Sequence, residues 1–130
     1  MLTIIKNMLY NFFAVFIGGG LGSIARFGIS LLMLQYYKAI FPLATLLSNI
    51  FSCMIFGLAI YMLGEKLNTE ISLRLLIITG FCGGFSTFSA FSYETVELIK
   101  TGNLMYAVLN ILVSLSACFG IIYFLTRSNV

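Results

Sequence analysis

Residues 80–91 of this chain read Gly80-Phe81-Cys82-Gly83-Gly84-Phe85-Ser86-Thr87-Phe88-Ser89-Ala90-Phe91, and they decide how the fold is interpreted. They lie inside the uncharged run 75–93, which is long enough to span a bilayer. Paired glycines lose much conformational entropy in a helix, and the nearby hydroxyls can bond freed backbone groups. Residues 83–89 therefore predict a break in a helix at membrane depth. Irregular backbone is tolerated there only against protein or a polar path, which favours an ion or permeation site.

The composition around this stretch indicates an integral membrane protein. The 130 residues are 61% hydrophobic and only 8% charged, too little polar surface to cover a soluble globule. The sequence contains neither His nor Asp, the side chains that hydrolases and proton relays use first. We therefore expect no enzyme, and a lipid bilayer rather than a nucleic acid as the surrounding partner. The charged residues are Lys6, Arg26, Lys38, Lys66, Arg74, Lys100, Arg127, Glu65, Glu70, Glu94 and Glu97.

Division of the chain at its charges predicts four transmembrane helices in a single domain that covers residues 1–130. A span needs about 20 apolar residues, and the expected spans are 8–33, 42–63, 72–98 and 103–125. The connections are short. Pro42 suits the first turn of the second helix, residues 64–70 predict a polar turn, and Gly102 is a plausible end for the third helix.

The distribution of basic residues leaves the orientation in the membrane open. An even number of spans places both termini on the side of the second connection. The side with the termini has four basic residues and the opposite side has two or three, which is a weak positive-inside bias. The chain could therefore insert both ways round and pair as an antiparallel, dual-topology dimer. A single fixed orientation is the alternative. The side with the termini collects Lys6, Lys66, Arg127 and Arg74, and the other side has Lys38 and Lys100 with Arg26 within reach.

Small residues in three of the spans predict close helix packing. The small-xxx-small pairs are Gly18 with Gly22, Gly80 with Gly84, and Ser116 with Gly120. The three cysteines, Cys53, Cys82 and Cys118, each fall in a different span. Their spacing suits neither a zinc site nor a disulfide framework, so we interpret them as small apolar packing residues.

Residues 18–27 read GGGLGSIARF, residues 45–49 read TLLSN, and residues 80–91 are given above. On these segments, above all the last, the chain resembles the Fluc (CrcB-type) fluoride channels, and the resemblance covers all four spans. It implies a dual-topology antiparallel homodimer with two fluoride pores. It also implies one central sodium ion, structural and not transported, where the two third-helix breaks cross.

The residues that would form the fluoride path follow from this resemblance. Fluoride is small and strongly hydrated, so a pore must replace water with hydrogen-bond donors and weak positive potentials. Asn49 offers two N–H donors, and the matching family asparagine faces the anion; an interhelical hydrogen bond is the alternative role. Phe88 and Phe91 share a helix face and could present electropositive ring edges, although a phenylalanine stripe is more often packing. Hydroxyl donors could come from Ser89 and Ser114.

The same resemblance assigns the sodium site, and the position of Arg26 indicates a pore mouth. Sodium would bind backbone carbonyls freed by the break, those of Gly83 and Ser86; the alternative is a kink satisfied internally by Ser86 and Thr87. Arg26 falls inside the first span and would attract anions to a vestibule, or else snorkel to the interface. Carboxylates repel fluoride, so Glu94 and Glu97 are assigned to helix-end solvation or interhelical pairing.

Several positions depart from the family pattern. Ser86 and Ala90 replace two threonines of the usual Thr-Thr-Phe-Ser-Thr-Phe. Asn110 stands where tyrosine is common, and Cys118 where serine or glycine is usual. Asn49 is preceded by Ser48 rather than valine and followed three residues later by Ser52 rather than glycine. The break, the phenylalanines and the asparagine remain, but a subunit that works only in a heterodimer with a divergent partner is left open.

The sequence thus predicts a fluoride-selective channel of the cell inner membrane or plasma membrane that exports cytoplasmic fluoride passively and lowers its toxicity. A small dual-topology multidrug exporter is one alternative, but it needs a membrane-embedded carboxylate that the first two predicted spans lack. A non-transporting membrane scaffold subunit is the other, since it would explain the packing glycines equally well.

Overall fold

The computed structural model describes residues 2–37 and 40–127, and four of its helices are long and apolar enough to cross a membrane. These described residues contain no strand, which confirms an all-α membrane protein with a broken third helix. Lys38, which entered the charge count, lies outside the described residues. The elements are α1 (Leu2–Tyr36), α2 (Leu43–Thr69), α3 (Ile71–Arg74), the π-helix η1 (Leu75–Cys82), α4 (Gly83–Phe85), α5 (Phe88–Lys100) and α6 (Leu104–Thr126).

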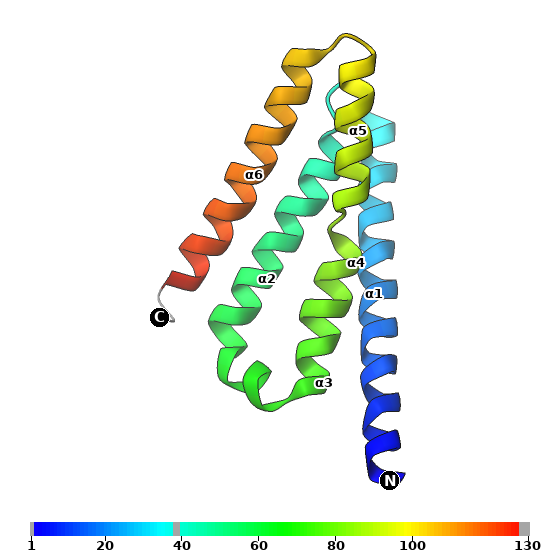
Figure 1. Cartoon of the computed structure of the whole chain (residues 1–130), viewed down its shortest axis with the longest axis vertical. Coiled ribbons are helices and arrows are strands. Elements are labelled where there is room, and N and C mark those ends of the chain that lie inside the picture. The colour runs from blue at the N-terminus through cyan, green and yellow to red at the C-terminus, as the bar shows by residue number, and fades with distance from the viewer. Residues whose placement is uncertain (1, 38–39, 128–130) are drawn as a thin grey trace.

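The helices alternate in direction, so α1 begins and α6 ends on the side where α2 meets α3 (Figure 1). The polar turn predicted over residues 64–70 is wrong, because α2 continues to Thr69 and only Glu70 leaves the helical conformation. Leu67 is buried at 2% exposure and anchors this last turn, and the Thr69 hydroxyl donates to the carbonyls of Glu65 and Lys66. Pro42 directly precedes α2.

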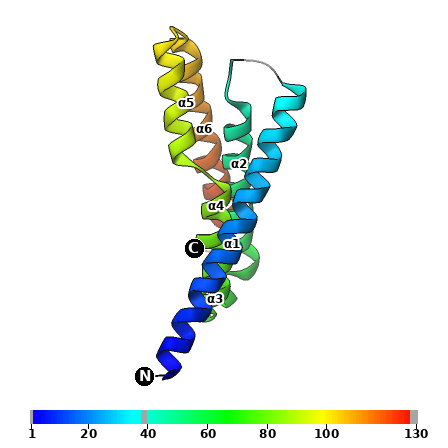
Figure 2. The same ribbon diagram turned by 90° about the vertical axis from the view of Figure 1, so that its right-hand side faces the viewer.

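The third span changes its packing partner at the break. Its first part, η1 and α4, lies against α1, whereas α5 packs on α6 and α2 and leans away from α1 (Figure 2). The break itself is confined to Ser86 and Thr87, both of which have extended backbone. The expectation that the glycine pair starts the break is therefore wrong, since Gly83 and Gly84 are helical.

Close packing against α1 explains why a glycine is needed in this helical turn. A Cβ on Gly84 would overlap the carbonyl oxygen of Gly19 and lie 3.0 Å from its Cα. Across the same contact, a Cβ on Gly22 would overlap the Phe81 carbonyl oxygen and lie 2.8 Å from the Phe85 nitrogen. The predicted glycine pairs of the first and third spans thus pack on each other within one chain. Ser116 and Gly120 are exposed and take no part in this contact.

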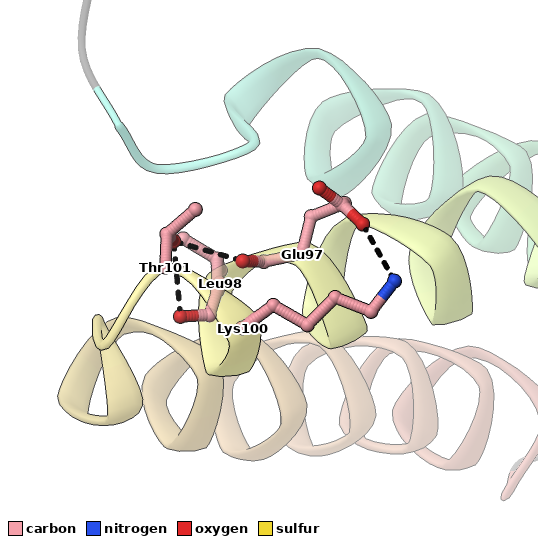
Figure 3. Close-up of polar contacts among 4 residues, drawn as sticks. All are labelled: Glu97, Leu98, Lys100 and Thr101. Atoms are coloured by element: carbon pink, nitrogen blue, oxygen red, sulfur yellow. Dashed lines mark hydrogen bonds and ion pairs between the residues drawn. The ribbon is translucent and has the colours of Figure 1, made fainter.

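A glycine also ends the third span, as predicted. Gly102 has a positive φ of 77°, its N–H bonds to the Ile99 carbonyl at 3.1 Å, and the Asn103 N–H bonds to the Leu98 carbonyl at 2.8 Å. This is the Schellman arrangement that closes a helix. The Thr101 hydroxyl donates to the carbonyls of Glu97 and Leu98, and Lys100 pairs with Glu97 at 3.1 Å (Figure 3).

The glycine contact predicts a stability difference between two alanine substitutions. Gly84→Ala should destabilise the protein by about 1–3 kcal/mol, because the added methyl group has no space against the α1 backbone. Gly28→Ala on α1 is the matched control, since a Cβ there meets nothing within 4 Å. Thermal unfolding of the detergent-purified variants measures the difference, and equal melting temperatures would show that the α1 contact is not close-packed.

Candidate functional site

The side chain of Asn49, on α2, brackets the backbone of the break. The Thr87 N–H donates to Asn49 Oδ1 at 2.8 Å, and Asn49 Nδ2 donates to the Thr87 carbonyl at 3.5 Å. Because a backbone N–H can only donate, this contact fixes which end of the Asn49 amide faces Thr87. The interhelical role considered for Asn49 is therefore present. One amide hydrogen is not used in the bracket.

Hydroxyl groups satisfy the rest of the break. The Cys82 carbonyl accepts hydrogen bonds of 2.9 Å from the Ser86 N–H, the Ser86 hydroxyl and the Ser52 hydroxyl of α2. The Thr87 hydroxyl oxygen accepts the Ala90 N–H at 3.2 Å and so caps α5. The kink is thus satisfied in part by its own Ser86 and Thr87, as one alternative expected.

Two backbone carbonyls lose their helical donors at this point. In a continuous helix, the Gly83 carbonyl would accept the Thr87 N–H and the Ser86 carbonyl would accept the Ala90 N–H. The first donor bonds instead to Asn49 and the second to the Thr87 hydroxyl. Among the described residues, no group of three or more Cys and Glu side chains could hold a metal. A hard cation at the break would therefore depend on these released carbonyl oxygens, which suit sodium.

A groove of about 200 Å³ opens beside the break and gathers most of the predicted fluoride-path residues. We call it the Asn49 groove. It is formed by α2, the break, α5 and α6, and Ser89 is not part of it; that exposed serine lies 3.2 Å from the Thr87 hydroxyl oxygen. The lining residues are Asn49, Cys53, Ser86, Thr87, Phe88, Phe91, Ser114, Leu115 and Cys118.

The break divides the phenylalanine stripe into two pairs with different surroundings. Phe88 and Phe91 line the Asn49 groove with ring centroids 5.8 Å apart and planes inclined by 38°. Phe88 is 77% exposed, so it contributes little to the core of this chain. Before the break, Phe85 is buried and meets Phe81 edge to face. Phe81 and Phe85 pack on each other within the protein, and only Phe88 and Phe91 face the groove.

A chain of hydrogen bonds behind the groove fixes the polarity of Ser114. The Ser114 hydroxyl donates to Asn110 Oδ1 at 3.4 Å, and Asn110 Nδ2 donates to the Thr95 hydroxyl oxygen at 2.9 Å. The Thr95 hydroxyl in turn donates to the Phe91 carbonyl at 2.7 Å. Asn110 is 1% exposed. In this arrangement Ser114 offers the groove an acceptor rather than the expected donor.

Arg26 lines a second hollow of about 300 Å³ between α1, α2 and α5, which we call the Arg26 pocket. Thr87 lines both hollows, so they lie on either side of the break. Glu94 also lines the Arg26 pocket. Its Oε1 accepts the Thr45 hydroxyl at 2.7 Å, whereas its Oε2 is buried without a partner among the described residues.

These contacts show what Glu94 and Glu97 bind, and they include residues to which the sequence analysis gave no role in the site. Glu94 makes the interhelical contact that was one of its expected roles, and Glu97 pairs with Lys100 near the helix end. Thr87, Thr45 and Asn110 were not predicted as site residues. Their signal is only the placement of polar side chains in apolar spans, which does not say what they contact.

Comparisons with known proteins support the resemblance. Residues 13–125 match the family described as "CrcB-like protein, Camphor Resistance (CrcB)". The chain is 45% identical to "Fluoride-specific ion channel FluC" of Serratia proteamaculans (strain 568), over 84% of this chain and 85% of that protein. It is 41% identical to the protein of that name in Azobacteroides pseudotrichonymphae genomovar. CFP2, over 85% and 88%. With that of Coxiella burnetii (strain CbuK_Q154) the identity is 40%, over 83% and 88%.

The Asn49 bracket predicts that this side chain stabilises the fold. Asn49→Ala should lower stability by about 1–3 kcal/mol, because both backbone groups of Thr87 lose their partner inside the protein. Hydrogen exchange at the Thr87 amide should become faster, which mass spectrometry of fragments covering residues 80–91 can follow. The control is Asn68→Ala, at an exposed asparagine near the end of α2. Unchanged exchange at Thr87 in Asn49→Ala would contradict the bracket.

Proposed function

Since the chain belongs to the CrcB-like family and is a fluoride-specific ion channel of the cell membrane, we propose that fluoride crosses through the Asn49 groove. The family is one of channels, so the protein is not an enzyme. One observation carries the proposal. Four side chains expected on the path, Asn49, Phe88, Phe91 and Ser114, come from three helices and line one groove.

The chemistry of the groove suits a hard anion. The Asn49 N–H that the bracket does not use is a donor inside a transmembrane span, and the edges of Phe88 and Phe91 can add weak positive potential. Among the described residues, no Lys or Arg lines the groove, so in this proposal fluoride is not held too tightly to leave. Selective conduction requires this balance between entry and release.

The Arg26 pocket supplies the approach to the groove in this proposal. Arg26 attracts the anion, and Thr87 is the shared wall at which fluoride passes from one hollow to the other. Ser23, which also lines this pocket, can add a hydroxyl contact. Thr45 holds Glu94 Oε1 by a hydrogen bond, which keeps part of that negative charge turned toward α2. Ser89 belongs to the exposed rim beside Thr87.

Ser114 joins the path only after a rearrangement. Its hydrogen points to Asn110, so it must leave that 3.4 Å contact before it can donate to fluoride. A turn of the Asn110 amide would offer Ser114 an N–H instead and release the serine hydrogen to the groove. The same turn would bring Asn110 Oδ1 to the Thr95 hydroxyl, so Thr95 must release the Phe91 carbonyl and donate to Asn110 instead.

Transport is passive and directed outward. Fluoride enters acidified cells as the neutral weak acid and dissociates in a less acidic cytoplasm. An inside-negative potential then drives the anion out with about 2.3 kcal/mol per 100 mV. The result is lower cytoplasmic fluoride and lower toxicity without an energy source.

We also propose that the working unit is an antiparallel dual-topology dimer with a structural sodium ion at the crossing of two breaks. A Cβ on Gly83 would meet nothing within its own chain, so a partner backbone can approach there. The released carbonyls of Gly83 and Ser86 would hold the ion, which would offset the aligned backbone dipoles rather than cross the membrane. The departures at Ala90, Asn110 and Cys118 leave room for a heterodimer with a divergent paralogue.

Phe88→Ile gives the sharpest test of the fluoride path. Fluoride efflux from liposomes, followed with a fluoride electrode, should fall by about tenfold or more, because the ring edge that replaces water is lost. Stability should not change, since Phe88 is mostly exposed in the chain. Phe119→Ile on α6 is the matched control, as Phe119 is also exposed but does not line the groove. Equal efflux in the two variants would refute the path.

The same liposomes separate the alternatives. Fluoride efflux without chloride efflux and without movement of a lipophilic cation is expected; cation exchange would indicate a multidrug exporter, and no flux a scaffold. Replacement of sodium by a large organic cation should weaken fluoride efflux while no sodium crosses. Sodium flux coupled to fluoride would overturn the structural role of the ion.

Dual topology predicts the behaviour of reporter fusions after Val130. A reporter active only in the cytoplasm and one active only outside it should both work, because neither side dominates in Lys and Arg. Three added lysines after Val130 should bias the population toward a cytoplasmic carboxyl terminus. A reporter that is silent in the unmodified chain would show a fixed orientation and exclude the antiparallel homodimer.

A further inference from the structure

Two cysteines meet inside the Asn49 groove. The Cys53 thiol of α2 lies beside the Cys118 thiol of α6, and both side chains are half-buried and line the groove. The sequence interpretation of these cysteines as separate packing residues missed this contact, because it depends on how two spans face each other.

The pair continues the row of side chains along the fluoride path. Cys53 follows Asn49 by one helical turn, and Cys118 follows Ser114 by one turn. Helices α2 and α6 run in the same direction and pack together, so both cysteines lie beyond Asn49 and Ser114 toward the end where α2 meets α3 (Figure 1). Any ligand held between the two sulfurs would therefore stand in the groove.

We propose that Cys53 and Cys118 form a binding site for a soft monovalent metal ion of the copper(I) class, and that its binding blocks fluoride conduction. Soft sulfur ligands select such ions over hard ones, and two sulfurs are sufficient for their two-coordinate geometry. Each metal–sulfur bond replaces an S–H bond, and the two protons leave to water in the groove. No oxidation is involved.

The surroundings make the site selective. The other groove side chains are amides, hydroxyls and aromatic or aliphatic groups, with no carboxylate or imidazole to favour magnesium or zinc. Fluoride and sodium are hard ions and compete poorly for sulfur. The third cysteine, Cys82, is buried next to Ser52 and does not line the groove, so it serves as an internal control. The block rests on the proposed function, whereas the metal site does not.

Silver(I) is the probe, because it is a soft monovalent ion that does not cycle between redox states. Purified protein in chloride-free buffer is titrated with silver nitrate, and native mass spectrometry counts the bound ions. One tightly bound ion per chain is expected in the parent protein and in Cys82→Ser. In Cys53→Ser and Cys118→Ser its affinity should fall at least 10–100-fold, roughly the loss caused by removing even an outer-shell partner. Equal affinity in all four proteins, or loss in Cys82→Ser alone, would overturn the site.

Fluoride efflux from the same preparations tests the block. Stoichiometric silver should reduce efflux by about tenfold in the parent protein and in Cys82→Ser, as expected for an occluded narrow path. It should leave Cys53→Ser and Cys118→Ser little changed, and excess dithiothreitol should restore the flux. Bound silver without loss of flux would overturn the block. Absent efflux before silver is added would instead refute the proposed function, while the binding titration would still decide the metal site.

Discussion

The bracket between Asn49 and Thr87 is the interaction on which the rest of the structure depends. A bilayer offers no water to backbone groups, so a break inside a transmembrane helix must find its partners in the protein. Asn49 accepts a hydrogen bond from the Thr87 N–H and donates one to the Thr87 carbonyl. Hydroxyl groups bond to the Cys82 carbonyl and to the first turn of α5. The break is thereby satisfied within the protein, and the carbonyls of Gly83 and Ser86 lose their helical donors.

The break lets one span pack against different helices on its two sides. Before the break, η1 and α4 need glycine to approach the α1 backbone closely. After the break, α5 packs on α6, and buried hydrogen bonds among Thr95, Asn110 and Ser114 join the two helices. A straight helix could not satisfy both neighbours. The two hollows that share Thr87 lie at this change of direction.

The supply of hydrogen-bond donors in the groove is small, and this bears on selectivity. Asn49 uses one amide N–H and its oxygen for hydrogen bonds to Thr87, and the Ser114 hydroxyl donates to Asn110. On the proposed path, fluoride would therefore be stabilised by few donors and by ring edges, which favours a small anion that can approach them closely. The sulfurs of Cys53 and Cys118 add polarisable but weak partners, and they give this channel a chemistry that hydroxyls at those positions would not provide.

The sequence by itself determined the membrane class, the four spans, close helix packing at glycines of the first and third spans, the Gly102 turn and a break near residues 83–89. These follow from local properties: apolar length, the missing Cβ of glycine and the hydroxyl content. Only the tertiary structure decided that the glycines stay helical and that the break falls at Ser86 and Thr87. It also decided the bracket by Asn49, the reversed polarity of Ser114 and the contact of Cys53 with Cys118. Each of these depends on a donor or a surface supplied by another helix, and spacing along one helix carries no information about its neighbour.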